Sequence, residues 1–172
     1  MLDFKQYIRE IPDFPKPGIS YKDITPLFLE PQVVSLCIEA ILDHLPGDTT
    51  IHKVVGIESR GFLLSSILAQ KHNAGLVLVR KPGKLPYTTH QRSYDLEYGQ
   101  DSVEIHTDSI HQGENVMIHD DVLATGGTAK ATNELVKHSG GHIIQNNFLI
   151  ELEDLKGREK LEGIDVFSLM RY

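Results

Sequence analysis

The chain has very little cysteine, no tryptophan and no long hydrophobic run. Its 172 residues include a single cysteine, Cys37, which excludes an intramolecular disulfide and a cysteine-rich metal site. No apolar stretch approaches the roughly 18 residues that a membrane-spanning helix needs. The N-terminal residues MLDFKQYIRE lack the basic start and apolar run of a secretion signal. These absences predict a cytoplasmic protein that does not act at a membrane.

Positive charge is also scarce. The chain has 17 Lys and Arg against 24 Asp and Glu, so its formal net charge is −7 at pH 7. A nucleic-acid groove or an anionic membrane surface calls for an excess of basic residues, so we expect neither as the main partner. A phosphate ligand is still possible, because backbone amides and a few cations can dominate a small site. The length fits one domain, residues 1–172.

Short β-branched runs alternate with helical patterns from about residue 53 onward. The predicted strands are KVVGI (53–57), LVLVR (76–80), VEIH (103–106), NVMIHD (115–120) and HIIQNNFLIEL (142–152). The predicted helices cover 61–72 and 128–139. Strands separated by helices of this length predict an α/β fold, in which a mostly parallel open sheet carries helices on both faces.

Three segments do not follow this alternation. Residues 14–28 are rich in proline and are predicted to form neither a strand nor a helix. A helix is predicted over 31–45, with apolar residues at helical spacing and Pro31 in its first turn. Residues 82–100 form a long polar connection between two predicted strands, and connections of that length are usually functional or mobile.

The stretch HDDVLATGGTAKAT (119–132) places two carboxylates directly before small residues. A strand is predicted to end near Asp120 and a helix to begin near Thr128, so the loop between them lies at a helix N-terminus. Such an end offers free amide donors and about half a positive charge, and glycines let a phosphate come close. The acidic pair is suited to ribose hydroxyls. The motif is neither GxxxxGK[ST] nor GxGxxG, which argues against nucleoside triphosphate and dinucleotide folds.

This stretch therefore predicts a site for a ribose 5-phosphate. The residues expected to hold it are Asp120, Asp121, Ala124, Thr125, Gly126, Gly127 and Thr128. The alternative is an ordinary strand-to-helix turn in which Thr128 caps the helix.

The segment DDVLATGGTA resembles the phosphoribosyl-pyrophosphate (PRPP) motif of type I phosphoribosyltransferases. Five further segments, in order along the chain, resemble the adenine phosphoribosyltransferase family. They are FPKPGISYKDITPLF (14–28), GIESRGFLLS (56–65), VRKPGKLP (79–86), LEYGQDSVEIH (96–106) and LKGREKL (155–161). The resemblance implies transfer of phosphoribose from PRPP to adenine, which gives AMP and pyrophosphate in purine salvage. It also implies a homodimer, and Mg²⁺ that PRPP holds with few or no direct protein ligands.

The resemblance assigns further residues to pyrophosphate and to catalysis. The pyrophosphate residues are Ser59, Arg60, Arg80, Lys81 and Lys84. Without the resemblance, such a basic cluster is more often only solvated. A lid loop at about 82–101 is expected to exclude water, with Glu97 as the candidate acid–base and Tyr98 closing the lid. Arg60 is the third expected catalytic residue. Composition alone would make Glu97 an ordinary solvated side chain.

The resemblance further implies a hood, built mainly from residues 1–30, that covers the base. The backbone N–H and C=O of Ser20 could read the purine edge, with Lys22 nearby and Val122 and Leu152 on either side of the ring. Core packing is an equally good explanation for the last two. Ser20, Lys22 and Tyr87 depart from the commoner family pattern. His119 is expected to be a strand-end histidine whose polar atoms are satisfied by neighbours; the alternative is a pH-sensitive role.

Two other functions compete with this one. A related enzyme could use hypoxanthine, guanine or xanthine, although the hood segment and LEYG favour adenine. A PRPP- or purine-sensing regulator would need a nucleic-acid surface or a further DNA-binding domain. The net charge of −7 and the presence of Glu97 argue against it.

Overall fold

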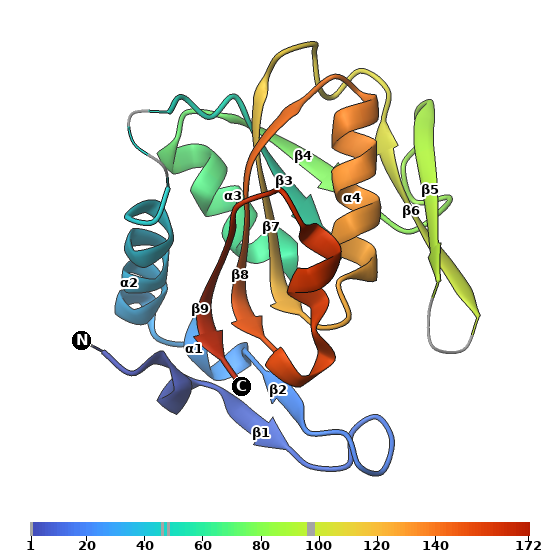
Figure 1. Ribbon diagram of the computed structural model, residues 1–172. Coiled ribbons are helices and arrows are strands. Elements are labelled where there is room, and N and C mark those ends of the chain that lie inside the picture. The colour runs from blue at the N-terminus through green and yellow to red at the C-terminus, as the bar shows by residue number, and fades with distance from the viewer. Residues whose placement is uncertain (1, 46, 48, 96–98) are drawn as a thin grey trace. The chain divides into compact units, whose positions relative to one another are not determined.

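The computed structural model in Figure 1 describes residues 2–45, 47, 49–95 and 99–172. The chain divides into two compact units, Met1–Asp43 and His44–Tyr172. The predicted hood falls within the first unit, and every other predicted site residue that the structure describes lies in the second. In the described ranges, no helix is both long and apolar enough to cross a membrane.

The first unit contains a small antiparallel hairpin and two α-helices. Its elements are the short 3-10 helix η1 (Phe4–Tyr7), β1 (Arg9–Ile11), β2 (Tyr21–Asp23), α1 (Thr25–Phe28) and α2 (Pro31–Leu42). The prediction that residues 14–28 form neither a strand nor a helix is therefore wrong. Pairing with β1 makes residues 21–23 a strand, and the Asp23 carboxylate accepts hydrogen bonds from Thr25 where α1 begins. Pro31 lies in the first turn of α2 as predicted, but the helix ends at Leu42 rather than residue 45.

The second unit is built on a five-stranded parallel sheet with the order β4-β3-β7-β8-β9 (Figure 1). The strands are β3 (Lys53–Ile57), β4 (Gly75–Val79), β7 (Asn115–Leu123), β8 (His142–Glu151) and β9 (Val166–Arg171). The predicted parallel α/β sheet is confirmed. The sequence interpretation missed β9, a short strand of mixed polar and apolar residues.

Helices cover both faces of this sheet. Helix α3 (Gly61–Lys71) follows β3, and α4 (Gly127–His138) follows β7. Val55 and Val116 pack in one cluster with Leu135 of α4. Gly56 points to the opposite face, where a Cβ would lie 2.2 Å from the Ser65 hydroxyl of α3. The two helices therefore lie on opposite sides, as predicted.

A second antiparallel hairpin consists of β5 (Thr89–Asp95) and β6 (Gln100–His106). Two sequence predictions fail here. Residues 103–106 are not a strand of the main sheet; they reach it through the bridge between Arg80 and Glu104 and through Val103 and Ile105, which pack in one cluster with the apolar side chains of β4. The expected long connection, 82–100, also contains a complete strand. This strand, β5, is polar on both faces, so no alternation of apolar and polar residues marks it in the sequence.

Candidate active site

The order of the strands reverses between β3 and β7, because the chain continues from β3 to one edge of the sheet and from β7 to the other. These strands are neighbours, and the helices that follow them leave on opposite faces. Ligands of open α/β sheets bind in the crevice at such a point. Four groups of predicted site residues follow the carboxyl ends of neighbouring strands: 59–60 after β3, 80–84 after β4, 124–128 after β7 and Leu152 after β8, while 120–122 form the last part of β7 itself. The fold therefore gathers segments that lie far apart in the sequence.

A cavity of about 70 Å³ lies at the N-terminus of α4. It is lined by Asp120, Val122, Leu123, Ala124, Thr125, Gly126, Gly127, Thr128, Ala129 and Phe148. Six of the seven residues predicted to hold ribose 5-phosphate are in this lining; Asp121 is not. Strand β7 runs to Leu123, so the prediction that it ends near Asp120 is wrong. Its continued parallel pairing with β8, up to Leu123 beside Glu151, extends it.

The N-terminus of α4 has no side-chain cap among the described residues. Gly126 occupies the N-cap position with φ of 76°, a left-handed conformation that favours glycine. Thr128 lies inside the first turn rather than before it, so it does not cap the helix as the alternative interpretation expected. The first amides of the helix are thus available to a ligand in the cavity.

Gly157 packs against the backbone of this loop. A Cβ on Gly157 would lie 2.1 Å from the Ala124 carbonyl oxygen, and a Cβ on Gly126 would lie 2.3 Å from the Gly157 carbonyl oxygen. The two backbones touch because neither residue carries a side chain. The sequence interpretation noted LKGREKL only as a family segment and gave Gly157 no role.

The two carboxylates of the acidic pair have different surroundings. Successive strand residues point to opposite faces, and the half-buried Asp120 lines the cavity, whereas Asp121 is buried. Arg60, directly before α3, places its Nε 2.7 Å from Asp121 Oδ2. Burial, followed by the charge of Asp121, raises the pKa of Asp120 well above its usual range. Burial also raises the pKa of Asp121, and Arg60 opposes that rise.

Two of the four predicted pyrophosphate cations, Arg80 and Lys84, pair with Glu58. Arg80 Nη2 is 3.2 Å and Lys84 Nζ 2.7 Å from Glu58 Oε1. The Lys81 ammonium instead donates to the Tyr94 hydroxyl at 2.8 Å and pairs with Asp101. The β5–β6 hairpin is thereby tied to the basic segment.

Comparison with known proteins agrees with this geometry. The phosphoribosyl transferase domain family matches residues 27–168. The adenine phosphoribosyltransferase of Christiangramia forsetii is 59% identical over 171 residues, which cover 99% of each chain. This chain belongs to the adenine phosphoribosyltransferase family.

Solved structures of the family extend the similarity to the fold. The crystal structure of adenine phosphoribosyltransferase from Rhodothermus marinus is 52% identical and has a TM-score of 0.94, covering 98% of this chain and 96% of that one. The Saccharomyces cerevisiae enzyme was solved with D-2,5-dideoxy-2,5-imino-altritol 1,6-bisphosphate and adenine. It is 41% identical with a TM-score of 0.92, and the match covers 96% of each chain.

The residues expected to contact adenine in this family are split between the two units. Val122 lines the cavity, and the Leu152 amide donates to the Leu123 carbonyl oxygen at 2.9 Å, so both residues lie at the carboxyl edge of the sheet. Lys22 Nζ is 2.7 Å from Glu10 Oε1 within the hairpin of the first unit, and the Ser20 hydroxyl donates to Glu10 Oε2 at 3.4 Å. Their contacts with adenine remain predictions.

The two lid residues expected of an adenine phosphoribosyltransferase, Glu97 and Tyr98, lie outside the described residues. Their catalytic roles remain predictions. The hairpin strands that flank them are described. Tyr94 of β5 lies close to Gly127, where a Cβ would meet the Tyr94 ring at 3.0 Å.

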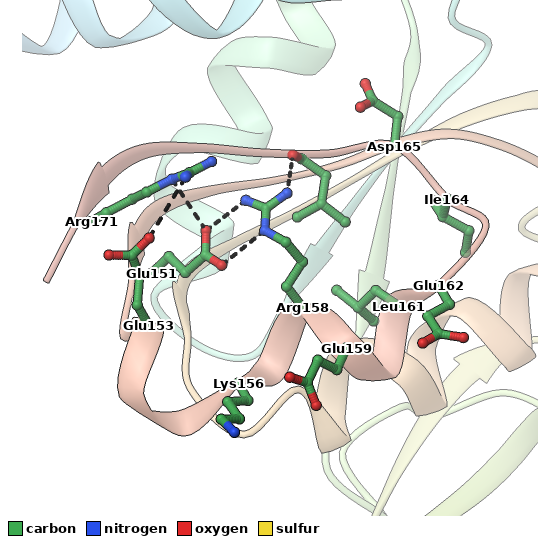
Figure 2. Close-up of a pocket in the computed structure, with 11 residues that line it drawn as sticks. Glu151, Glu153, Lys156, Arg158, Glu159, Leu161, Glu162, Ile164, Asp165 and Arg171 are labelled. Carbon is green, nitrogen blue, oxygen red and sulfur yellow. Dashed lines mark hydrogen bonds and ion pairs between the residues drawn. The ribbon is translucent and has the colours of Figure 1, made fainter.

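Figure 2 shows a charged cluster in a pocket of about 580 Å³. Arg158 donates to both Glu151 oxygens, at 2.9 and 2.6 Å, and to the Val166 carbonyl oxygen at 2.6 Å. Its guanidinium lowers the pKa of Glu151, which is buried. These bonds fix the residue after Gly157 to β8 and β9. The Arg158 bonds therefore help to hold Gly157 against the loop at the end of β7.

His119 is completely buried in β7. Its Nδ1 lies 2.5 Å from Asn147 Oδ1, on the neighbouring strand, while Nε2 has no partner among the residues that the structure describes. The expected strand-end position is wrong, because β7 continues to Leu123, and the expectation of satisfied polar atoms is right for one ring nitrogen only. Burial lowers the pKa of His119 to about 4, although the Asn147 contact opposes that shift.

Proposed function

We propose that the second unit binds PRPP across the carboxyl ends of β3 and β7, with the 5-phosphate in the cavity at α4. The observation that carries this proposal is the cavity itself, where an uncapped helix N-terminus meets a loop without bulky side chains. The half-buried Asp120 carboxylate beside it suits the ribose hydroxyls. The protein is an adenine phosphoribosyltransferase: it transfers the phosphoribosyl group of PRPP to adenine and produces AMP and pyrophosphate.

The pyrophosphate end of PRPP is assigned to Ser59, Arg60, Arg80, Lys81 and Lys84. As the bond to the anomeric carbon breaks, positive charge develops on the sugar and negative charge grows on the leaving group. Fixed cations stabilise that negative charge. Arg60 contributes from a position set by its ion pair with Asp121, which joins the pyrophosphate segment to the ribose segment.

Mg²⁺ belongs to this proposal as a companion of PRPP. It is a hard cation that prefers oxygen ligands and keeps several waters. The donor set fits an ion that the substrate carries: Asp120 lines the cavity, whereas the Asp121 carboxylate is occupied by Arg60. When bound, Mg²⁺ neutralises part of the pyrophosphate charge. Asp120, the acidic side chain facing the cavity, would orient the ribose hydroxyls beside it.

For the base, the proposal assigns Val122 and Leu152 to the ring faces and the Ser20 backbone to the purine edge. Within the described ranges, no hydrogen bond occupies the Ser20 N–H or C=O. A matched donor and acceptor pair favours adenine over hypoxanthine, whose oxygen would face the carbonyl. The Lys22 side chain is committed to Glu10. Glu97 and Tyr98 complete the proposed machinery as acid–base and lid.

A homodimer and a cytoplasmic location are also part of the proposal. Three leucines with exposed side chains, Leu63 of α3 and Leu76 and Leu78 of the edge strand β4, offer apolar surface for a second copy. Sedimentation velocity at micromolar concentration should give the mass of two chains. A single-chain mass at that concentration would contradict the dimer.

The test of function is pyrophosphate release with PRPP and Mg²⁺ in the presence of adenine, hypoxanthine, guanine or no base. Release with adenine alone is expected. Release with another base instead would overturn the assignment of the Ser20 backbone. PRPP binding without release for any base would favour a sensing role over catalysis.

A further inference from the structure

Glu58 connects two segments that are expected to bind the same ligand group. It follows β3 directly and precedes Ser59 and Arg60 in the chain. Its carboxylate accepts from the Lys81 backbone amide at 2.8 Å, in addition to its contacts with Lys84 and Arg80. One side chain thus contacts three residues of the basic segment 80–84, namely Arg80, Lys81 and Lys84.

The basic segment is a preformed turn. The Lys84 amide donates to the Lys81 carbonyl oxygen at 3.3 Å, and the two central residues are Pro82 and Gly83, with φ of 77° at Gly83. This matches the sequence preference of a type II turn. The Gly83 amide donates to Glu104 Oε2 at 3.1 Å, which fixes the tip of the turn. The backbone is therefore ordered, and the positions of the cationic ends depend on what holds the side chains.

Glu58 holds the cationic groups of Arg80 and Lys84 and leaves some of their N–H donors free for a ligand. Lys84 spends one of its three N–H donors on Glu58 and keeps a side chain that is 51% exposed. Arg80 donates from Nη1 to the Lys84 carbonyl oxygen at 3.0 Å and from Nη2 to Glu58, which leaves further guanidinium donors. Both cations can contact an incoming anion while they stay paired with Glu58.

The Glu58 carboxylate is ionised at neutral pH. Burial would raise the pKa of Glu58, but hydrogen bonds from Lys84, the Lys81 amide and Arg80 outweigh burial and lower the pKa to about 2. The side chain is only 11% exposed, so solvent screens these bonds weakly.

We propose that Glu58 is a positioning residue that holds Arg80 and Lys84 of the 80–84 turn ready for the pyrophosphate of PRPP. This rests on the proposed assignment of that turn to pyrophosphate. The opposite role for Glu58 is that of a competitor, whose carboxylate binds Arg80 and Lys84 in place of pyrophosphate. The two roles predict opposite signs, because removing a positioning residue weakens PRPP binding and removing a competitor tightens it.

The experiment compares Glu58→Gln and Glu58→Ala with the unmodified protein. The steady-state KM for PRPP, the KM for adenine and the Kd for Mg²⁺–pyrophosphate are measured, the last by calorimetry. We expect both variants to raise the KM for PRPP and the Kd for pyrophosphate by about tenfold or more. Glu58→Gln should have the smaller effect because its amide oxygen can still accept from Lys81 N–H. The KM for adenine should stay within about twofold. Partial loss of folding would instead lower kcat and leave both KM values unchanged.

A matched control is Glu114→Gln. Glu114 also accepts a backbone amide, that of His111, at 2.8 Å and pairs with a lysine, Lys53, at 3.6 Å. Lys53 begins β3, so this pair lies at the opposite end of the strand from Glu58. Glu114→Gln should leave all three constants unchanged, and circular dichroism should show that every variant is folded. Tighter pyrophosphate binding or unchanged constants in the Glu58 variants would overturn the proposal.

A Lys84→Gln variant separates this proposal from the assignment on which it rests. If Lys84→Gln weakens pyrophosphate binding and the Glu58 variants do not, only the positioning role fails. If Lys84→Gln also has no effect, the assignment of the turn to pyrophosphate fails.

Discussion

Replacing Gly157 with alanine should disturb the phosphate loop without touching any ligand. The added methyl carbon would lie 2.1 Å from the Ala124 carbonyl oxygen and 2.9 Å from the Gly126 amide nitrogen. Both contacts involve backbone, so the two segments must separate by about 1 Å to restore ordinary contact distances. Overpacking of this kind costs about 1–3 kcal/mol of folding free energy.

The effect on catalysis should exceed the effect on stability. A displacement of about 1 Å in a positioning element can cost about 10²-fold in rate. We expect kcat/KM for PRPP to fall by about 10- to 100-fold in Gly157→Ala, while the KM for adenine changes little. Steady-state AMP formation gives the constants, and urea denaturation gives the free energy of unfolding.

Gly163→Ala is a control in the same region of the chain. Gly163 has φ of 79°, and a Cβ there would meet nothing within 4 Å. The variant should lose about 1–2 kcal/mol of stability through backbone strain but keep normal kinetic constants. Normal PRPP kinetics in Gly157→Ala would refute the idea that contact between these glycines sets the loop position.

Three further predictions concern charge and protonation. The double variant Asp120→Asn, Asp121→Asn should abolish PRPP binding in calorimetry, while its circular dichroism spectrum stays that of the folded protein. Normal PRPP affinity would contradict the assignment of these residues to the ribose. Burial lowers the pKa of His119 from its usual 6.5 to about 4 in the folded protein, so folding favours the neutral form. The stability that this contributes, on the order of 3 kcal/mol, is complete above about pH 6.5 and lost as pH falls toward 4. His119→Gln should flatten the dependence of unfolding free energy on pH in that window, and an unchanged slope would show that another group causes it. Glu97→Ala should lower turnover more than it weakens substrate binding, and unchanged kcat would remove Glu97 from the chemistry.

The parallel core could be predicted because its signals are local. Strands β3 and β7 are apolar runs buried on both faces, and helices of ordinary length follow them. The two hairpins could not be found in this way. Strand β5 is polar along its length, and β1 and β2 have only three residues each, so pairing with a partner strand defines them. Pairing with β8 likewise carries β7 past its acidic pair to Leu123.

The candidate site was predicted where one segment carries its own chemistry. The loop 124–128 combines glycines, threonines and a helix start within a few residues. The contacts of Gly157 and of the Glu58 side chain were missed because their partners are distant in the sequence: Gly157 contacts Ala124 and Gly126, and the Glu58 carboxylate contacts the turn at 80–84. Only the fold brings these segments together.

The measurement that tests the central claim most directly is an NMR titration of backbone amides with ribose 5-phosphate. If the loop at α4 holds the 5-phosphate, the amide protons of residues 125–128 should shift downfield and saturate together, because they donate to the phosphate oxygens. The amides around Gly163 should stay unchanged. Saturable shifts elsewhere in the second unit, with residues 125–128 unaffected, would contradict the assignment.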